Sequence, residues 1–265
     1  MTGKKLKFTS KSESNHARPP VLNCTSMLEV HNLHVSSENK PILNGVSLKI
    51  KPGEIHALMG PNGSGKSSLS LALMGHPRYQ ITSGKITLDG KNITHLTPDK
   101  RAKAGLFLAM QYPIAVPGVS VANFLRTSVR NLKGEVNTAE FVKSLKGEMS
   151  QLKIDESFAS RPINDGFSGG EKKKMEVLQL SILQPRYAVL DETDSGLDVD
   201  ALKLVAEGIK KVRGTQLGIL LITHYQRILK YIRPDYVHIL VEGKIIKTGD
   251  YLLAQVIERA GYNKV

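Results

Sequence analysis

The chain has 265 residues, 40% hydrophobic and 23% charged, which excludes a disordered tail and a disulfide-rich miniprotein. Its single cysteine, Cys24, excludes an internal disulfide and any zinc site or iron–sulfur cluster built from this chain's own thiolates, and it favours a reducing compartment. A net charge of +13, from 37 basic and 24 acidic residues, favours anionic partners such as nucleotides, nucleic acid or acidic proteins.

Residues 1–26 are predicted to form a mobile basic N-terminal arm, followed by one domain over 27–265. The arm has five basic residues against one acidic residue, contains Pro19-Pro20 and shows no apolar periodicity. It lacks the apolar core of a secretory signal. We interpret it as a solvated extension of a cytoplasmic protein; the alternative is the remnant of a transit peptide, which would place the protein in the plastid stroma.

The first half of the domain predicts strands and one compact strand–turn–helix unit. Apolar and polar residues alternate over 28–35 and 42–50, as in strands at a sheet edge. A short buried strand over 55–59 runs into a glycine-rich turn and then a helix over 67–74. A further strand over 85–88 ends in the Asp89-Gly90 turn.

The middle of the chain, about 111–185, is predicted to be an inserted helical subdomain. Phe141, Leu145, Met149 and Leu152 share one helical face, which we interpret as core packing. The segments 187–190 and 219–222 then predict central strands, and 237–241 with 244–247 predict a hairpin. Strands that alternate with helices predict an α/β fold with a parallel sheet covered on both faces. The apolar run 218–222 is far shorter than the ~20 residues of a membrane span, so no direct membrane insertion is expected.

A phosphate loop follows the strand over 55–59. The segment matches the pattern G-x-x-x-x-G-K-[ST], with a strand before it and a helix after it. Glycines let backbone N–H groups surround a phosphate, and the helix directs its positive end at the same group. Lys66 would bridge β- and γ-phosphate oxygens, and the hydroxyl of Ser67 would bind Mg²⁺. The loop consists of Gly60, Pro61, Asn62, Gly63, Ser64, Gly65, Lys66 and Ser67, and we add Ser68 to the predicted contacts.

Two carboxylates, Asp191 and Glu192, end the apolar strand that begins at Tyr187. The carboxyl edge of a parallel sheet is where its ligands bind, so this pair is expected beside the phosphate loop. We predict that Asp191 holds Mg²⁺, directly or through water, and that Glu192 polarises the attacking water.

A second phosphate site is predicted over 167–171. Ser168, Gly169, Gly170 and Glu171 open a helix, and such a turn makes an anion-binding nest. One nucleotide cannot use two distant sites on one molecule. The economical arrangement is therefore a head-to-tail dimer, in which the γ-phosphate lies between Lys66 of one copy and Ser168 and Gly170 of the other.

The order of these motifs resembles that of the ATP-binding-cassette ATPases over about 27–261. The resemblance rests on the phosphate loop, the Ser-Gly-Gly motif, the Asp191-Glu192 strand end, 195–198 and His224. It implies a P-loop ATPase core with a parallel central sheet, an antiparallel β subdomain and an inserted helical subdomain. It also implies MgATP hydrolysis, with Gln111 touching Mg²⁺ and water, Asp198 as the acid of a subunit-crossing loop and His224 as the γ-phosphate sensor.

Several positions differ from the transporters of this family. Glu171 stands where Gln is usual, Phe167 where Leu is usual, and Thr193-Asp194 where Pro-Thr is usual. No aromatic residue lies between Phe8 and Tyr79, so the ring that stacks on adenine in many relatives is missing. We expect aliphatic or imidazole groups such as Val35 and His34 to hold the base, with loose discrimination between ATP and GTP.

Within the family, four segments resemble the ATPases of the SUF iron–sulfur cluster assembly system. The resemblance implies scaffold partners of the SufB and SufD type, moved by a dimer that forms transiently on ATP binding. The segment 111–120 is a candidate docking site, or else an ordinary connecting loop. Lys172, Lys173 and Lys174 are interpreted as a solvated helix face, and the alternative is that they pair with nearby carboxylates. The alternatives are an ATP-binding subunit of a membrane transporter and a nucleic-acid-binding ATPase; we expect no nucleic-acid partner, because the chain has neither a second cassette nor a long coiled-coil insertion. The four segments are 111–120, 166–173, 194–198 and 223–227.

Overall fold

The computed structural model describes residues 26–262, except 215 and 224–225. The arm predicted over 1–26 therefore lies, apart from Ser26, outside the described residues, and so does His224. The described chain forms two sheets. One has four strands in the order β2-β1-β4-β5, and the other has six in the order β10-β9-β3-β8-β7-β6.

The four-stranded sheet is antiparallel throughout. Its strands are β1 (Leu28–Ser37), β2 (Lys40–Ile50), β4 (Gln80–Leu88) and β5 (Lys91–Asn92). The alternation over 28–35 and 42–50 is confirmed as strand, and its apolar positions are buried except Ile42, which is partly buried. Strand β4 begins five residues before the predicted strand, because its first residues are mostly exposed and carry no apolar pattern.

The six-stranded sheet is parallel except at one edge. Strands β6 (Leu106–Ala109), β7 (Tyr187–Asp191), β8 (Gly218–Ile222), β3 (Ile55–Met59) and β9 (Tyr236–Val241) run parallel in that order. Strand β10 (Lys244–Gly249) pairs antiparallel with β9, which confirms the predicted hairpin. All residues of β3, β7 and β8 are buried, as expected for strands covered on both faces.

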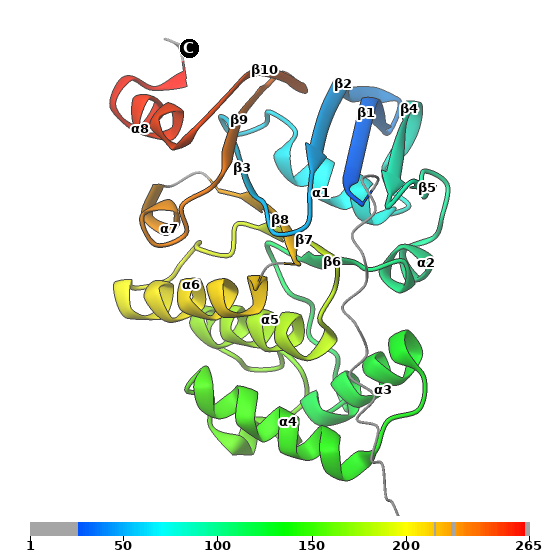
Figure 1. Cartoon of the computed structure of the whole chain (residues 1–265), viewed down its shortest axis with the longest axis vertical. Coiled ribbons are helices and arrows are strands. Elements are labelled where there is room, and N and C mark those ends of the chain that lie inside the picture. Colours follow the sequence, from blue (N-terminus) through cyan, green and yellow to red (C-terminus); the bar gives the residue numbers. More distant parts are fainter. Residues whose placement is uncertain (1–25, 215, 224–225, 263–265) are drawn as a thin grey trace, which may run out of the picture.

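The central sheet separates two hydrophobic cores. Along β3, Ala57 belongs to one core and Leu58 to the other, because successive side chains point to opposite faces. On the Leu58 side the sheet packs against helix α1 (Lys66–Met74) and the antiparallel sheet. On the Ala57 side it packs against helices α5 (Gly169–Leu183) and α6 (Val199–Arg213). Figure 1 shows α5 and α6 below the central strands and the antiparallel sheet above them.

Helices dominate the stretch between β6 and β7. They are α3 (Val121–Lys133), α4 (Thr138–Gln151), the short 3-10 helix η1 (Glu156–Ser160) and α5. The predicted stripe of Phe141, Leu145, Met149 and Leu152 is buried in the core, as expected. Figure 1 places α3 and α4 at the end of the molecule farthest from the antiparallel sheet. The remaining helices are α2 (Pro98–Lys103), α7 (Gln226–Tyr231) and α8 (Tyr251–Ala260).

Four parallel strands end at the same edge of the central sheet. Gly60 follows β3, Met110 follows β6, Glu192 follows β7 and Thr223 follows β8. In open α/β sheets the carboxyl ends of the strands form the ligand-binding edge. The topology thus brings the predicted phosphate loop, Gln111 and both strand-end carboxylates to one place.

Candidate functional site: a phosphate loop facing a glutamine and two carboxylates

The shape of the phosphate loop depends on glycine. Gly63 and Gly65 have φ angles of +77° and +103°, a left-handed conformation that strains other residues. Gly65 is also the N-cap of α1. A Cβ atom at Gly60 would lie 2.1 Å from the backbone oxygen of Leu240, so a side chain there would push the loop off strand β9. The loop is thereby fixed against the sheet, with the N-terminus of α1 at its end.

Lys66 is drawn into this loop. Its Nζ donates to the backbone oxygens of Gly60 and Pro61, each at 2.9 Å, and the residue is only 4% exposed. Burial lowers the pKa of Lys66, while the nearby carboxylates of Glu192 and Asp191 oppose that shift. The ammonium group is held among loop carbonyls at the position from which it can reach a bound phosphate.

Asp191 accepts hydrogen bonds from two hydroxyls of α1. Ser70 Oγ donates to its Oδ2 at 2.7 Å, and Ser67 Oγ donates to its Oδ1 at 3.3 Å. Burial raises the pKa of Asp191, while the two serine bonds act in the opposite direction. Ser70 was not among the predicted site residues, although its position three residues after Ser67 places both hydroxyls on one face of the helix.

Gln111 and Glu192 meet across strands β6 and β7. Gln111 Nε2 donates to Glu192 Oε2 at 2.5 Å. The backbone N–H of Glu192 donates to the oxygen of Ile222 at 2.9 Å, and its φ of +49° turns the chain sharply after β7. The amide nitrogen of Gln111 is occupied by this bond, which directs its amide oxygen elsewhere in the site.

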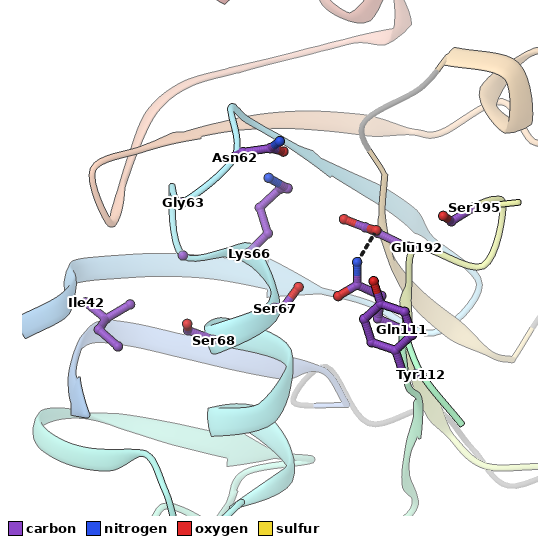
Figure 2. Close-up of a pocket in the computed structure, with 11 residues that line it drawn as sticks. Ile42, Asn62, Gly63, Lys66, Ser67, Ser68, Gln111, Tyr112, Glu192 and Ser195 are labelled. Atoms are coloured by element: carbon purple, nitrogen blue, oxygen red, sulfur yellow. Dashed lines mark hydrogen bonds between the residues drawn. The ribbon is translucent and has the colours of Figure 1, made fainter. Parts of the chain in front are cut away.

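A cavity of about 740 Å³ lies between these groups. Figure 2 shows the phosphate loop with Lys66 on one side and Gln111 and Glu192 on the other. The volume falls within the usual range of a small-molecule pocket. The predicted residues that line it are Asn62, Gly63, Gly65, Lys66, Ser67, Ser68, Gln111 and Glu192.

The expectation for adenine was wrong at Val35, which is buried in the core. Alternation along β1 turns this side chain inward. Ile42 of β2 lines the cavity instead, with Tyr112 and Ser195, which the sequence did not single out as lining residues. Ile42 was missed because it stands in a strand whose apolar residues all look alike in sequence.

Ser168 opens helix α5 in a capping box. Its backbone N–H donates to Glu171 Oε2 at 2.7 Å, and the N–H of Glu171 donates to Ser168 Oγ at 3.3 Å. The backbone N–H of Ser168 holds the pKa of Glu171 below its ordinary value. Among the described lining residues of the cavity, none comes from 168–171. The structure thus places the second predicted phosphate site apart from the first.

Asp198 is the exposed N-cap of α6, where its Oδ1 accepts from the N–H of Ala201 at 2.7 Å. Just before it, Asp194 Oδ2 accepts from Thr223 Oγ1 at 2.7 Å, which joins the loop after β7 to the end of β8. Of the three lysines after Glu171, Lys172 and Lys174 are partly exposed, whereas Lys173 does not belong to a solvated face and instead pairs with a carboxylate, that of Glu176. Lys173 is 4% exposed because its position on α5 faces inward.

The oxygen donors here fit Mg²⁺ bound together with a nucleotide. Hydroxyl, amide and carboxylate oxygens from Ser67, Gln111 and Asp191 are hard ligands, and Mg²⁺ usually combines one or two of these with substrate phosphates. Across the described part of the chain, no group of three or more His, Cys, Asp or Glu residues could hold a metal ion. This donor set therefore suits a cation delivered with phosphate.

Within the described residues no helix is long and apolar enough to span a bilayer.

Comparison with known proteins places the chain in a family. The model of the ABC transporter family matches residues 43–195. Vegetative protein 296 of Bacillus subtilis is 52% identical over 241 residues, covering 90% of this chain and 92% of the relative. The probable ATP-dependent transporter SufC of Escherichia coli is 47% identical over 241 residues, covering 89% and 97%.

A solved structure shares the fold. It is the dimeric post-hydrolysis state of the ATP-binding cassette MJ0796 bound to ADP and Pi, with a TM-score of 0.74 at 19% identity, covering 85% of this chain and 99% of that chain. The predicted α/β cassette fold is confirmed. The chain belongs to the ABC transporter family, as an ATP-hydrolysing cassette of the SufC type.

Proposed function

We propose that the chain is the ATPase of a SUF-type iron–sulfur cluster assembly complex, which hydrolyses MgATP at a head-to-tail dimer interface and moves scaffold partners of the SufB and SufD type. The observation that best supports ATP hydrolysis at this site is the hydrogen bond from Gln111 to Glu192. The two residues face Lys66 across a nucleotide-sized cavity. The assignment to iron–sulfur assembly is supported by the 47% identity to SufC and by the SUF-like segments in the sequence.

The reaction is in-line attack of water on the γ-phosphoryl group, in which the protein mainly positions groups and neutralises charge. Lys66 balances charge on the β- and γ-phosphates. Ser67, Asp191 and the amide oxygen of Gln111 would hold Mg²⁺, which offsets phosphate charge when bound. Glu192 orients the water or accepts its proton, and the bond from Gln111 fixes the carboxylate for this task. His224, which lies outside the described residues, is proposed as the γ-phosphate sensor.

The second half of the site is proposed to come from another copy of the chain. Ser168, Gly169, Gly170 and Glu171 begin the 15-residue helix α5, whose first-turn N–H groups favour an anion. They stand apart from the phosphate-loop cavity of their own chain, which agrees with a site completed in trans. In this arrangement Asp198 lies in the loop that crosses between subunits, and hydrolysis releases the bridge that ATP makes.

A scaffold partner is proposed to dock on the segment after Gln111. Tyr112 and Ile114 are 79% and 68% exposed, which is unusual for large apolar side chains so close together. Beside them lies a groove of about 180 Å³ lined by Ile114, Val116 and Phe124. A partner bound here would sense the γ-phosphate through Gln111.

Two substitutions test the chemistry. Glu192→Gln should retain ATP binding while turnover falls by roughly 10²–10⁴-fold, because the general base is lost. Size-exclusion chromatography with ATP should then show a stable dimer. Lys66→Ala, which removes a phosphate contact, should lose both binding and dimerisation. Unchanged turnover in Glu192→Gln would show that another group activates the water.

The partner is identified by what co-purifies with the tagged chain from its native cells. Soluble scaffold proteins are expected. The specific alternative is the ATP-binding subunit of a membrane transporter, favoured by the word transporter in the names of several relatives, and a permease in the membrane fraction would support it. A reducing location, the cytoplasm or else the plastid stroma, is proposed from the single cysteine.

A further inference from the structure

Helix α5 contains a buried ion pair that the proposed reaction does not use. Lys173 Nζ lies 3.0 Å from Glu176 Oε2, and each residue is 4% exposed. Burial raises the pKa of Glu176 to about 7, although Lys173 opposes that shift. Desolvating two charges is costly, and apolar residues of similar size often replace such pairs without loss of stability. The stability of the fold alone therefore gives little reason for this pair.

The pair binds the backbone of the chain just beyond β6. Lys173 Nζ donates to the oxygen of Met110 at 3.1 Å and makes a longer contact of 3.4 Å with that of Gln111. Glu176 accepts a hydrogen bond from the backbone N–H of Met110. Residues of α5 thus satisfy both polar backbone groups of Met110. Met110 needs these partners because it follows the last residue of β6, where the chain no longer pairs with a neighbouring strand.

A second attachment holds the same segment four residues later. Asn164 Nδ2 donates to the oxygen of Ile114 at 3.0 Å, and the N–H of Val116 donates to the oxygen of Ile163 at 3.1 Å. Gln111 lies between the two attachments. Its backbone is held by Lys173 and its side chain by the bond to Glu192, so its orientation is set from both ends.

We propose that Lys173 and Glu176 are positioning residues that hold Gln111, and through it Glu192, in line with the phosphate loop, and that they carry movements of α5 to this site. Helix α5 starts at the Ser168–Gly170 turn, five residues before Lys173. Engagement of that turn by the nucleotide of a second copy would therefore be felt at Gln111 of the same chain. This inference rests on the roles proposed above for Gln111 and for the turn.

The test removes the pair without leaving a lone buried charge. In the double variant Lys173→Met with Glu176→Leu, apolar side chains of similar length fill the same space. We expect kcat for ATP to fall by roughly 10²-fold, since a misplacement of about 1 Å can cost that much. The KM should stay within about twofold, because binding through the phosphate loop is unchanged. The matched control is Lys172→Met, the neighbouring lysine on the same helix, which should keep kcat within about twofold.

A second variant separates positioning from simple ion pairing. Exchanging the charges, Lys173→Glu with Glu176→Lys, keeps both charges but presents a carboxylate to the carbonyl of Met110 and an ammonium to its N–H. We expect kcat to stay low in this variant, and Lys173→Arg, which keeps the donors, to lose less than tenfold. Thermal unfolding of each variant verifies that it is folded at the assay temperature. The exchange variant and Lys173→Arg supply the test where the apolar variant does not fold.

Full kcat in the apolar variant, or full recovery in the exchange variant, would overturn the proposal. Gln111→Ala shows which inference has failed. If Gln111→Ala keeps full kcat, the role proposed for Gln111 is wrong and the positioning proposal falls with it. If Gln111→Ala is slow while the apolar variant is fully active, only the positioning proposal is wrong.

Discussion

Arg101 offers a sharp test of how the phosphate loop is supported. The side chain is 2% exposed and donates to four backbone oxygens, those of Leu96 (2.9 Å), Ala72 (2.8 Å), Leu73 (2.6 Å) and Thr94 (2.6 Å). Two of these oxygens belong to the last turn of α1, the helix whose first turn carries Lys66 and Ser67. Burial lowers the pKa of Arg101 to about 10, which still leaves the guanidinium charged at neutral pH.

The expected cost of Arg101→Met follows from these contacts. A hydrogen bond from a charged donor makes a net contribution of about 1.5–3 kcal/mol, so four of them would contribute at most about 6–12 kcal/mol if they were independent, which four bonds from one guanidinium are not. Taking the guanidinium out of water costs several kcal/mol. Truncation also leaves buried carbonyl oxygens without this donor. The free energy of unfolding should fall by about 3–5 kcal/mol, a large share of the 5–15 kcal/mol typical of a domain.

Urea denaturation followed by circular dichroism measures this loss. The matched control is Lys103→Met, an exposed position on the same short helix, which should change the free energy of unfolding by less than about 0.5 kcal/mol. Arg101→Lys should fall between the two, because one ammonium cannot reach all four oxygens. A loss below about 1 kcal/mol in Arg101→Met would refute the reasoning, since removing four charged hydrogen bonds should lower the free energy of unfolding by more than that.

Two further predictions concern pH and base recognition. Burial lowers the pKa of His238, which contacts His56 at 2.9 Å, to about 4 from 6.5, so between these pH values the unfolded chain binds a proton that the folded chain does not. The free energy of unfolding should fall as the pH drops through that window, by about 3 kcal/mol at most, and a His238→Gln variant that kept the full slope would contradict this. Aliphatic Ile42 lines the cavity on the side of β2, and the aromatic ring of Tyr112 lies on the opposite side, beside Gln111. A base seated on Ile42 should give ATP and GTP similar affinity, and Ile42→Tyr should tighten both by about fivefold or more through stacking. Fluorescence titration measures both; a large preference of the native chain for ATP, or no gain in the variant, would count against a base seated there.

Local patterns were enough to predict the strand–loop–helix unit around Lys66, the apolar strand that ends at Asp191 and the helix that begins at Ser168. Each is encoded by neighbouring residues: glycines at the turn, an apolar run before the carboxylates, and a serine with a glutamate three residues later for the capping box. The folded site also contains contacts between residues that are far apart in the sequence, which no short segment reveals. Ser70 meets Asp191 across 121 positions, and Gln111 meets Glu192 across 81.

Lys173 shows why the remainder could not be predicted. Three consecutive lysines normally indicate a solvated face, and a helix with one covered side would leave them all at the surface. Helix α5 is covered on more than one side, so buried residues occur nearly all around it. One of the three lysines must then point inward, and only the packing of the neighbouring segments decides which. Short strands such as β6, with four residues, also give too little pattern to identify.

Because the backbone of Glu192 is left-handed, the residue that is best for stability at this position is not the one that is best for activity. A side chain with a Cβ atom costs roughly 1–2 kcal/mol in that conformation, while Gly avoids the cost and Asn tolerates it better. Variants at this position should therefore rank in one order for thermal resistance and in nearly the reverse order for turnover. Selection for a higher free energy of unfolding alone would replace Glu192 and lower the rate of ATP hydrolysis. The strained glutamate is therefore retained only where selection also acts on ATP hydrolysis.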